Sequence, residues 1–235
     1  MALGEFAQRT PSSAYSLRIH LSEKKFEIED NCGGISVDVA RKYAFRFGRP
    51  GEFPPAKHSI GQFGIGMKRA LFKMGNKFRV ESSTERSRFV VEVDVNKWKT
   101  TAEELKPAGN RGDWHFRFAE LDENEDETRV AGTTITVTEL HDGVAAQFGL
   151  ENFRTKLAQK LTSTHQYSLS HGLEIGIGET KLAAEPITLL SSESIKPLHQ
   201  RLRLPGRLRV EVFAGISPSN PEKAGWYVFC NGRLV

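Results

Sequence analysis

The chain has 235 residues, of which 38% are hydrophobic and 26% are charged. This composition is typical of a globular protein with a buried core and excludes the disordered and fibrous classes. The sequence has no apolar run of the roughly 20 residues that a membrane span needs, and no basic-then-apolar signal pattern at its start. We therefore expect a cytoplasmic protein that does not span a membrane.

Charge and cysteine content limit the partners of the chain only weakly. The formal net charge of +4 permits a nucleic-acid partner without requiring one. Cys32 and Cys230 lie too far apart for a metal motif and are too few for a disulfide scaffold, so we expect reduced thiols. The seven histidines show no metal or triad spacing.

The first elements along the chain are a hairpin and a helix. Residues 15–29 form two alternating runs around a polar centre, which predicts a hairpin that ends directly before Asp30. Ser36 lies where a helix N-cap is expected, and Gly48 and Pro50 should end that helix. Its predicted apolar face consists of Val39, Ala40, Tyr43, Ala44 and Phe47.

The middle of the chain alternates strands with two blocks of helix. Residues 49–60 hold three prolines and one glycine, which predicts an irregular surface loop. A second helix should cover 67–74 and close at Gly75. Three antiparallel strands should follow, at 77–84, 87–95 and 133–140. The acidic stretch 120–127 should form a solvated loop, and residues 152–169 should form an amphipathic helix. This order favours an α+β two-layer sandwich over a parallel sheet of repeating βαβ units.

The pattern changes after about residue 186, where short strands and turns continue with no further helix predicted. We expect an N-terminal segment at 1–14, a main domain at 15–186 and the start of a second, β-rich domain at 187–235.

Three glycines, Gly61, Gly64 and Gly66, come directly before the second helix. The backbone N–H groups at a helix start lack intrahelical partners and carry partial positive charge, so bare amides there favour an anion such as phosphate. A Walker loop is excluded because Gly66 is followed by Met67-Lys68, and a dinucleotide-binding turn would follow the first strand of a βαβ unit. Taken alone, the glycine string fits an unliganded turn equally well.

The order of three motifs resembles a known superfamily. "DNCGG" at 30–34, "GQFGIG" at 61–66 and "GTTITV" at 132–137 follow the order found in the GHKL, or Bergerat-fold, ATPases. These include gyrase, MutL, the ninety-kilodalton heat-shock chaperones, histidine kinases and MORC proteins. The wording "GQFGIGMK" is especially similar to the chaperone and MORC forms, and "VFCNGRLV" at 228–235 is similar to a strand of the transducer domain in MutL and gyrase. The resemblance covers roughly residues 15–175 and implies a Bergerat ATP-binding fold.

The resemblance also implies roles for residues of this chain. Asp30 would accept a hydrogen bond from the adenine amino group, Gly34 would let the base lie against the backbone, and Thr133 would support Asp30 through a water. Residues 49–60 would form a mobile lid. The phosphates would be held by the segment Gly61, Gln62, Phe63, Gly64, Ile65 and Gly66.

Each of these roles has a plainer alternative. Asp30 could cap a turn, Thr133 could be an ordinary strand residue, and Cys32 is expected to be a small packing residue. We expect Lys68 and Arg69 on an exposed helix face, without direct phosphate contact.

The family's chemistry depends on a first helix bearing Glu-x-x-x-Asn, whose glutamate activates water and whose asparagine binds Mg²⁺. No asparagine precedes Asn31, and Glu5 is followed four positions later by Arg9. In "DNCGG", Cys32 also occupies the place of the usual first glycine. ATP and Mg²⁺ are the implied cofactors, and the chain supplies no catalytic residue and no metal ligand that we can identify. We expect nucleotide-driven lid closure and homodimerisation in a longer parent ATPase, with hydrolysis severely impaired in this chain.

The alternative is a non-catalytic module of the same fold that binds nucleic acid or a protein. Its support is the segment 199–210, in which Arg201, Arg203, Arg207 and Arg209 alternate with apolar residues. A two-residue turn would split the arginines between two faces, whereas a three-residue loop at 204–206 would align all four. No aromatic residue interleaves them, so a solvated strand face is favoured over a nucleic-acid site.

Overall fold

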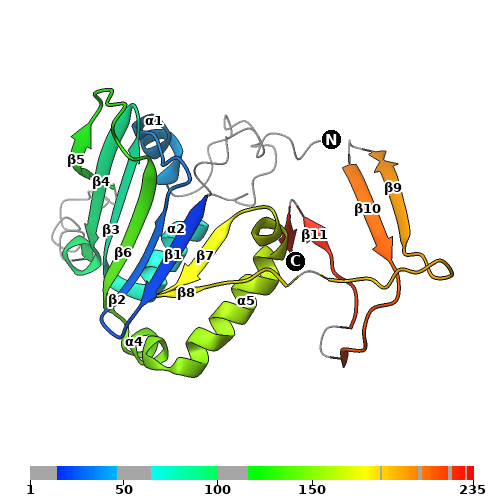
Figure 1. Cartoon of the computed structure of the whole chain (residues 1–235). Helices are drawn as coiled ribbons and strands as arrows, with labels where there is room; N and C mark the ends of the chain where they lie inside the picture. Colours follow the sequence, from blue (N-terminus) through cyan, green and yellow to red (C-terminus); the bar gives the residue numbers. More distant parts are fainter. Residues whose placement is uncertain are drawn as a thin grey trace.

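The computed structural model describes residues 15–46, 65–99, 116–185, 187–205, 208–221, 224–230 and 232–235. Most of the described chain belongs to one eight-stranded mixed sheet with the strand order β5-β4-β3-β6-β2-β1-β7-β8 (Figure 1). All neighbours are antiparallel except β1 and β7, because helix α5 carries the chain back across the sheet before β7. The strands are β1 (Ser16–Leu21), β2 (Lys25–Asp30), β3 (Gly75–Thr84), β4 (Ser87–Asp94), β5 (Phe118–Asp122), β6 (Gly132–Leu140), β7 (Glu174–Ile177) and β8 (Thr180–Lys181).

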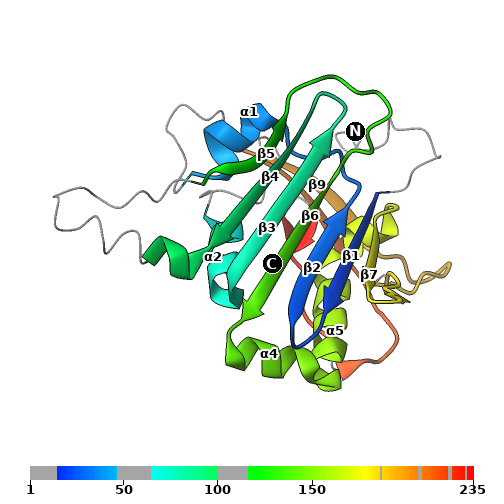
Figure 2. The ribbon, with the colours of Figure 1, turned by 90° about the vertical axis from the view of Figure 1, so that its left-hand side faces the viewer.

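Helices cover one face of this sheet. In Figure 2 the strands lie in front and helices α2 and α5 lie behind them. The predicted α+β two-layer sandwich is therefore confirmed. The described helices include α1 (Val37–Val39), which continues as a π-helical turn (Ala40–Ala44), and α2 (Gly66–Met74), α4 (Asp142–Gly149) and α5 (Glu151–Ser170).

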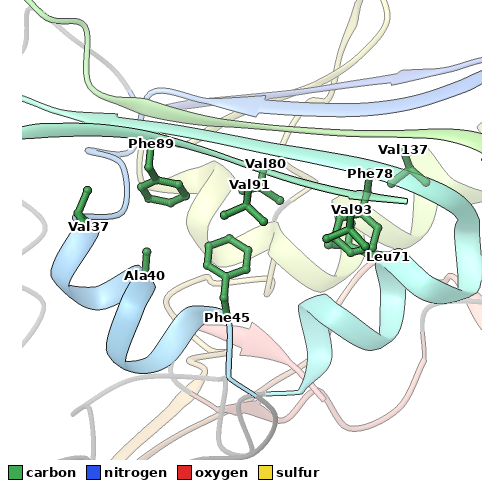
Figure 3. Close-up of a cluster of buried hydrophobic side chains, with 10 residues drawn as sticks. All are labelled: Val37, Ala40, Phe45, Leu71, Phe78, Val80, Phe89, Val91, Val93 and Val137. Atoms are coloured by element: carbon green, nitrogen blue, oxygen red, sulfur yellow. The ribbon is translucent and has the colours of Figure 1, made fainter. Parts of the chain in front are cut away.

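The core lies between the sheet and the first two helices. Alternate residues of β3, β4 and β6 point toward α1 and α2, as period-two strands require, and meet the apolar side chains of these helices (Figure 3). The buried cluster consists of Val37, Ala40, Phe45, Leu71, Phe78, Val80, Phe89, Val91, Val93 and Val137. This packing places α1, which follows β2, and α2 on the same face of the sheet.

The first helix differs from its predicted form. Ser36 Oγ accepts a hydrogen bond from the Val39 amide at 3.3 Å, which confirms the N-cap. The helix then widens, and the Phe45 amide bonds to the Ala40 carbonyl five residues back. Val37 and Ala40 take the buried positions, so Val39 between them is 42% exposed, whereas Phe45 is buried and packs edge-to-face on Phe89. The prediction that Val39 belongs to the buried face is wrong, and Phe47, Gly48 and Pro50 lie outside the described residues.

The acidic stretch 120–127 is only partly a loop. Its first three residues belong to β5, where Arg88 pairs with Glu120 at 2.7 Å and Arg129 pairs with Asp122 at 2.7 Å. The prediction of a loop over the whole stretch is therefore wrong, because neighbouring arginines neutralise the acids and allow them to enter a strand.

Two small sheets follow the main one. Strands β9 (Leu198–Leu204) and β10 (Leu208–Ala214) form a hairpin that stands away from the eight-stranded sheet in Figure 1. Strands β11 (Phe229–Cys230) and β12 (Arg233–Leu234) pair with each other, and β12 packs on α5. The predicted domain boundary near residue 186 stays a prediction. Among the helices of the described ranges, none is both long and apolar enough to cross a membrane.

Candidate functional site

Three polar residues form a row across three adjacent strands of the sheet. Asp30 ends β2 and is paired with Thr133 of β6, and Thr133 is paired in turn with Ser82 of β3. Residues directly opposite each other in antiparallel strands project from the same face. Ser82 is also paired with Phe89, which belongs to the core cluster under the helices. The row therefore lies on the helix-covered face, where the apolar core gives way to polar side chains.

Ser82 links this row to the neighbouring segments, and it was not among the site residues predicted from the sequence. Its side chain is fully buried, and its Oγ accepts a hydrogen bond from the Ile35 amide at 2.7 Å. The same Oγ lies 2.9 Å from Thr133 Oγ1 and 3.2 Å from the Gly132 carbonyl oxygen. Ser82 thus joins the segment after Asp30 to the start of β6. The sequence "ESST" at 81–84 does not indicate which of its two serines is buried, because nothing in such a polar run distinguishes a buried serine from an exposed one.

Asp30 and Cys32 form a turn directly after β2. Asp30 Oδ1 accepts a hydrogen bond from the Cys32 amide at 2.7 Å, so the turn-capping alternative is confirmed for one carboxylate oxygen. A carboxylate has about four acceptor positions, so this bond leaves capacity for a further donor. Cys32 is exposed, and the prediction that it is a small packing residue is wrong. Partial burial of its thiol and the neighbouring Asp30 carboxylate raise its pKa to about 11.

Two glycines of the "DNCGG" motif have left-handed backbone conformations, with φ of 100° at Gly33 and 71° at Gly34. A Cβ at Gly34 would lie 1.9 Å from the Ser83 carbonyl oxygen, whereas a Cβ at Gly33 would meet nothing within 4 Å. Gly34 is therefore required by close packing on β3, and its contact with a base stays a prediction. Gly132 has a similar role, because its Cβ would lie 2.2 Å from the Asp30 carbonyl oxygen. The glycines of the first and third motifs let the chain segments around Asp30 approach closely.

The glycine segment before α2 is described only at its end. Gly61, Gln62, Phe63 and Gly64 lie outside the described residues. Ile65 and Gly66 are exposed, and Ile65 at the N-cap position supplies no side-chain cap to the nine-residue helix α2. The first amides of such a helix point along its axis without intrahelical partners. Because Leu71 of α2 belongs to the core cluster, this helix lies on the same face of the sheet as the polar row.

Lys68 is buried, contrary to its predicted place on an exposed face. Only 3% of the residue is exposed, and its Nζ donates a hydrogen bond to the Ala44 carbonyl oxygen at 2.8 Å. Burial lowers the pKa of its ammonium below the ordinary lysine value. The neighbouring Arg69 is exposed, as predicted. Lys68 therefore joins the end of the π-helical turn to the first turn of α2.

The described residues offer hydrogen-bonding groups of two kinds on one face of the sheet. Asp30 offers a carboxylate acceptor and Thr133 a hydroxyl on one face, and the start of α2 offers amide donors on that same face. Across the described ranges, no group of three or more His, Cys, Asp and Glu side chains could hold a metal ion. The described residues therefore supply no cluster of acidic, histidine or cysteine side chains that would hold Mg²⁺.

These features agree with a family comparison. Residues 10–128, just over half of the chain, match the model of the protein family described as histidine kinase-, DNA gyrase B- and HSP90-like ATPase. The chain therefore belongs to this family, and the resemblance to the GHKL ATPases is confirmed. Its α+β sandwich is the ATP-binding fold of these proteins.

Solved structures and curated proteins add little beyond the family. The ATPase region of Saccharomyces cerevisiae topoisomerase II is 11% identical, with a TM-score of 0.48 over 72% of this chain and 43% of that chain. The same region bound to ICRF-187 (dexrazoxane) is 11% identical, with a TM-score of 0.46 and the same coverage. The chain thus spans less than half the length of these structures. No curated protein matches it.

Proposed function

We propose that this chain is the ATP-binding domain of a GHKL-type ATPase, with the nucleotide held between the end of β2 and the start of α2. The observation that carries the proposal is the row of Asp30, Thr133 and Ser82 on the helix-covered face, the face on which α2 also begins. An acceptor for the base and bare amides for the phosphates are thereby available on one side of the sheet.

Each residue of the row has a distinct proposed task. Asp30 accepts a hydrogen bond from the adenine amino group, a donor that guanine lacks at that position. Ser82 orients Thr133 through the 2.9 Å contact between their hydroxyl oxygens, and Thr133 in turn supports Asp30 from the neighbouring strand. Gly34 lets the base approach the backbone, and the backbone amides of residues 61–66 hold the phosphates.

In the whole protein, ATP binding is proposed to close a lid at residues 49–60 and to bring two copies together. The main domain would cover 15–186 and the start of a transducer-like domain 187–235. The motif sequences are most similar to those of the chaperone, MORC and MutL branch. ATP is the proposed nucleotide with Mg²⁺ as its counter-ion, and hydrolysis by this chain is proposed to be severely impaired.

Calorimetric titration of the chain with ATP and with GTP tests the binding proposal. We expect saturable binding of ATP, much weaker binding of GTP, and loss of ATP binding in Asp30→Asn. Glu29→Gln is the matched control, because Glu29 is the preceding residue of the same strand and therefore projects from the opposite face. Equal binding of ATP by wild type and Asp30→Asn would contradict the assignment of Asp30.

A further inference from the structure

The β9–β10 hairpin has two faces of opposite character. Leu204 is paired with Leu208, so the two strands are separated by three positions of the sequence, one position later than in the predicted pairing. This register places Arg203 directly opposite Arg209 and Arg201 directly opposite Glu211. The other face is largely apolar and consists of Leu198, Leu202, Leu204, Leu208, Val210, Val212 and Ala214 with Gln200.

The arginine face also carries an aromatic platform. His199 is paired with Phe213, two positions along from the Arg201 and Glu211 pair, so both rings project from the arginine face. Their ring centroids lie 4.3 Å apart with an interplanar angle of 11°, and Phe213 is 58% exposed. As predicted, no aromatic residue lies between the arginines, and the strand register instead adds an aromatic pair at the end of the arginine row. Phe213 lies beyond the stretch in which the arginines alternate, and the strand register places it on the same face, next to the Arg201 and Glu211 pair.

The charge on this face is not balanced by the hairpin itself. Arg201 Nε donates to Glu211 Oε1 at 2.7 Å, and this pair neutralises itself. Arg203 and Arg209 face each other as like charges, an arrangement that is unfavourable unless an anion lies between or above them. Both residues are exposed. The face therefore provides two guanidinium groups for an anion and, beyond the Arg201 and Glu211 pair, a flat ring stack.

We propose that the arginine face of the β9–β10 hairpin binds single-stranded nucleic acid. Arg203 and Arg209 contact backbone phosphates, and a base stacks on the Phe213 ring. Cationic side chains that follow the backbone, together with aromatic rings that accept any base, are the general means by which proteins hold single strands without sequence preference. An acidic protein segment would use the arginines but would gain nothing from an exposed ring stack. This site is independent of the proposed nucleotide pocket.

The test is fluorescence anisotropy of a short labelled oligothymidylate and of the matching oligouridylate, titrated with the chain at several salt concentrations. Each phosphate neutralised on a single strand contributes a slope of about −0.7 to the plot of log K against log salt. The double variant Arg203→Gln/Arg209→Gln should therefore weaken binding at low salt and make this slope shallower by about 1.4. Phe213→Leu should weaken binding roughly tenfold with little change in slope.

Two controls separate this site from a general charge effect. Lys156→Gln/Lys160→Gln removes the same charge from exposed positions of α5 and should leave most of the binding intact. Unchanged ATP titration and circular dichroism of the arginine variant show that the fold and the nucleotide pocket are preserved. The proposal is overturned if both double variants have equal effects, if Phe213→Leu binds as wild type does, or if polyglutamate competes as well as the oligonucleotides.

Discussion

The ammonium group of Lys68 donates a hydrogen bond to the Ala44 carbonyl oxygen at 2.8 Å, although only 3% of the lysine is exposed. Ala44 ends the π-helical turn, and Lys68 lies in the first turn of α2. The bond therefore joins the helical segment before the glycine cluster to the helix after it.

Lys68→Met should make the free energy of unfolding less dependent on pH in the alkaline range. Burial lowers the pKa of Lys68 below 10.5, so between that lowered pKa and 10.5 the unfolded chain binds more protons than the folded chain. The folded state then becomes more stable as pH rises through this range. Urea unfolding at several pH values should show the difference in free energy of unfolding, wild type minus variant, increasing with pH. Lys73→Met, at an exposed position of the same helix, is the control, and a constant difference for Lys68→Met would refute the prediction.

Ser82→Ala should lower the free energy of unfolding by about 1–3 kcal/mol, because the partly buried Ile35 amide would lose its hydrogen-bond acceptor, the fully buried Ser82 hydroxyl. The variant should also bind ATP more weakly, since Thr133 loses its hydroxyl contact. Denaturant titration and calorimetry measure the two effects. Ser83→Ala, on the opposite face of β3, is the matched control, and equal effects of the two substitutions would count against a special role for Ser82.

Gly34→Ala should be far more damaging than Gly33→Ala. Both glycines have positive φ, which costs a residue with a Cβ about 1–2 kcal/mol. At Gly34 the new Cβ would also collide with the Ser83 carbonyl oxygen, which adds an overpacking cost of about 1–3 kcal/mol. Thermal or denaturant unfolding of the two variants measures the difference. Similar stabilities would show that the segment moves away from β3 without cost.

Cys32 should react slowly with alkylating reagents despite its exposure. A pKa of about 11 in place of 9.0 reduces the thiolate fraction, and after allowance for the greater nucleophilicity of the more basic thiolate the rate should fall about tenfold near neutral pH. Asp30→Asn should restore part of this rate, because the carboxylate is the smaller of the two influences, after burial. Intact-mass kinetics in a Cys230→Ser background measure this, with Glu29→Gln as the control. No acceleration in Asp30→Asn would rule out the carboxylate as a cause.

The chain should show negligible ATP turnover in the presence of Mg²⁺. No asparagine precedes Asn31, and the sequence before Asp30 has no Glu-x-x-x-Asn to supply a general base and a metal ligand. Phosphate release should stay at background while ATP binding is saturated. A magnesium-dependent rate that Asp30→Ala abolishes would show that the chain supplies these groups elsewhere.

The sequence by itself determined the elements of the fold and the family. Alternating and helical patterns are local properties, so the first hairpin, β3, β4, β6, α2 and α5 could be predicted from residue spacing alone. The order of three short motifs was sufficient for the resemblance that the family comparison confirms. Asp30 and Thr133 could be predicted as site residues from their motifs. Asp30 lies at the end of one predicted strand and Thr133 at the start of another, and the family places these two strands together.

Only the tertiary structure showed which further residues contact the motif residues and which side chains are buried. Ser82 could be identified as a neighbour of Thr133 only because β3 lies beside β6. This pairing brings together residues 51 positions apart in the sequence. The burial of Lys68 and the exposure of Val39 depend on how α1 and α2 pack on the sheet, which helical periodicity alone does not specify. The stack of His199 on Phe213 depends on the register of one hairpin, where a shift of a single residue would move a side chain to the other face. Long-range pairing and register are decided by packing of the whole chain, so local sequence patterns do not carry them.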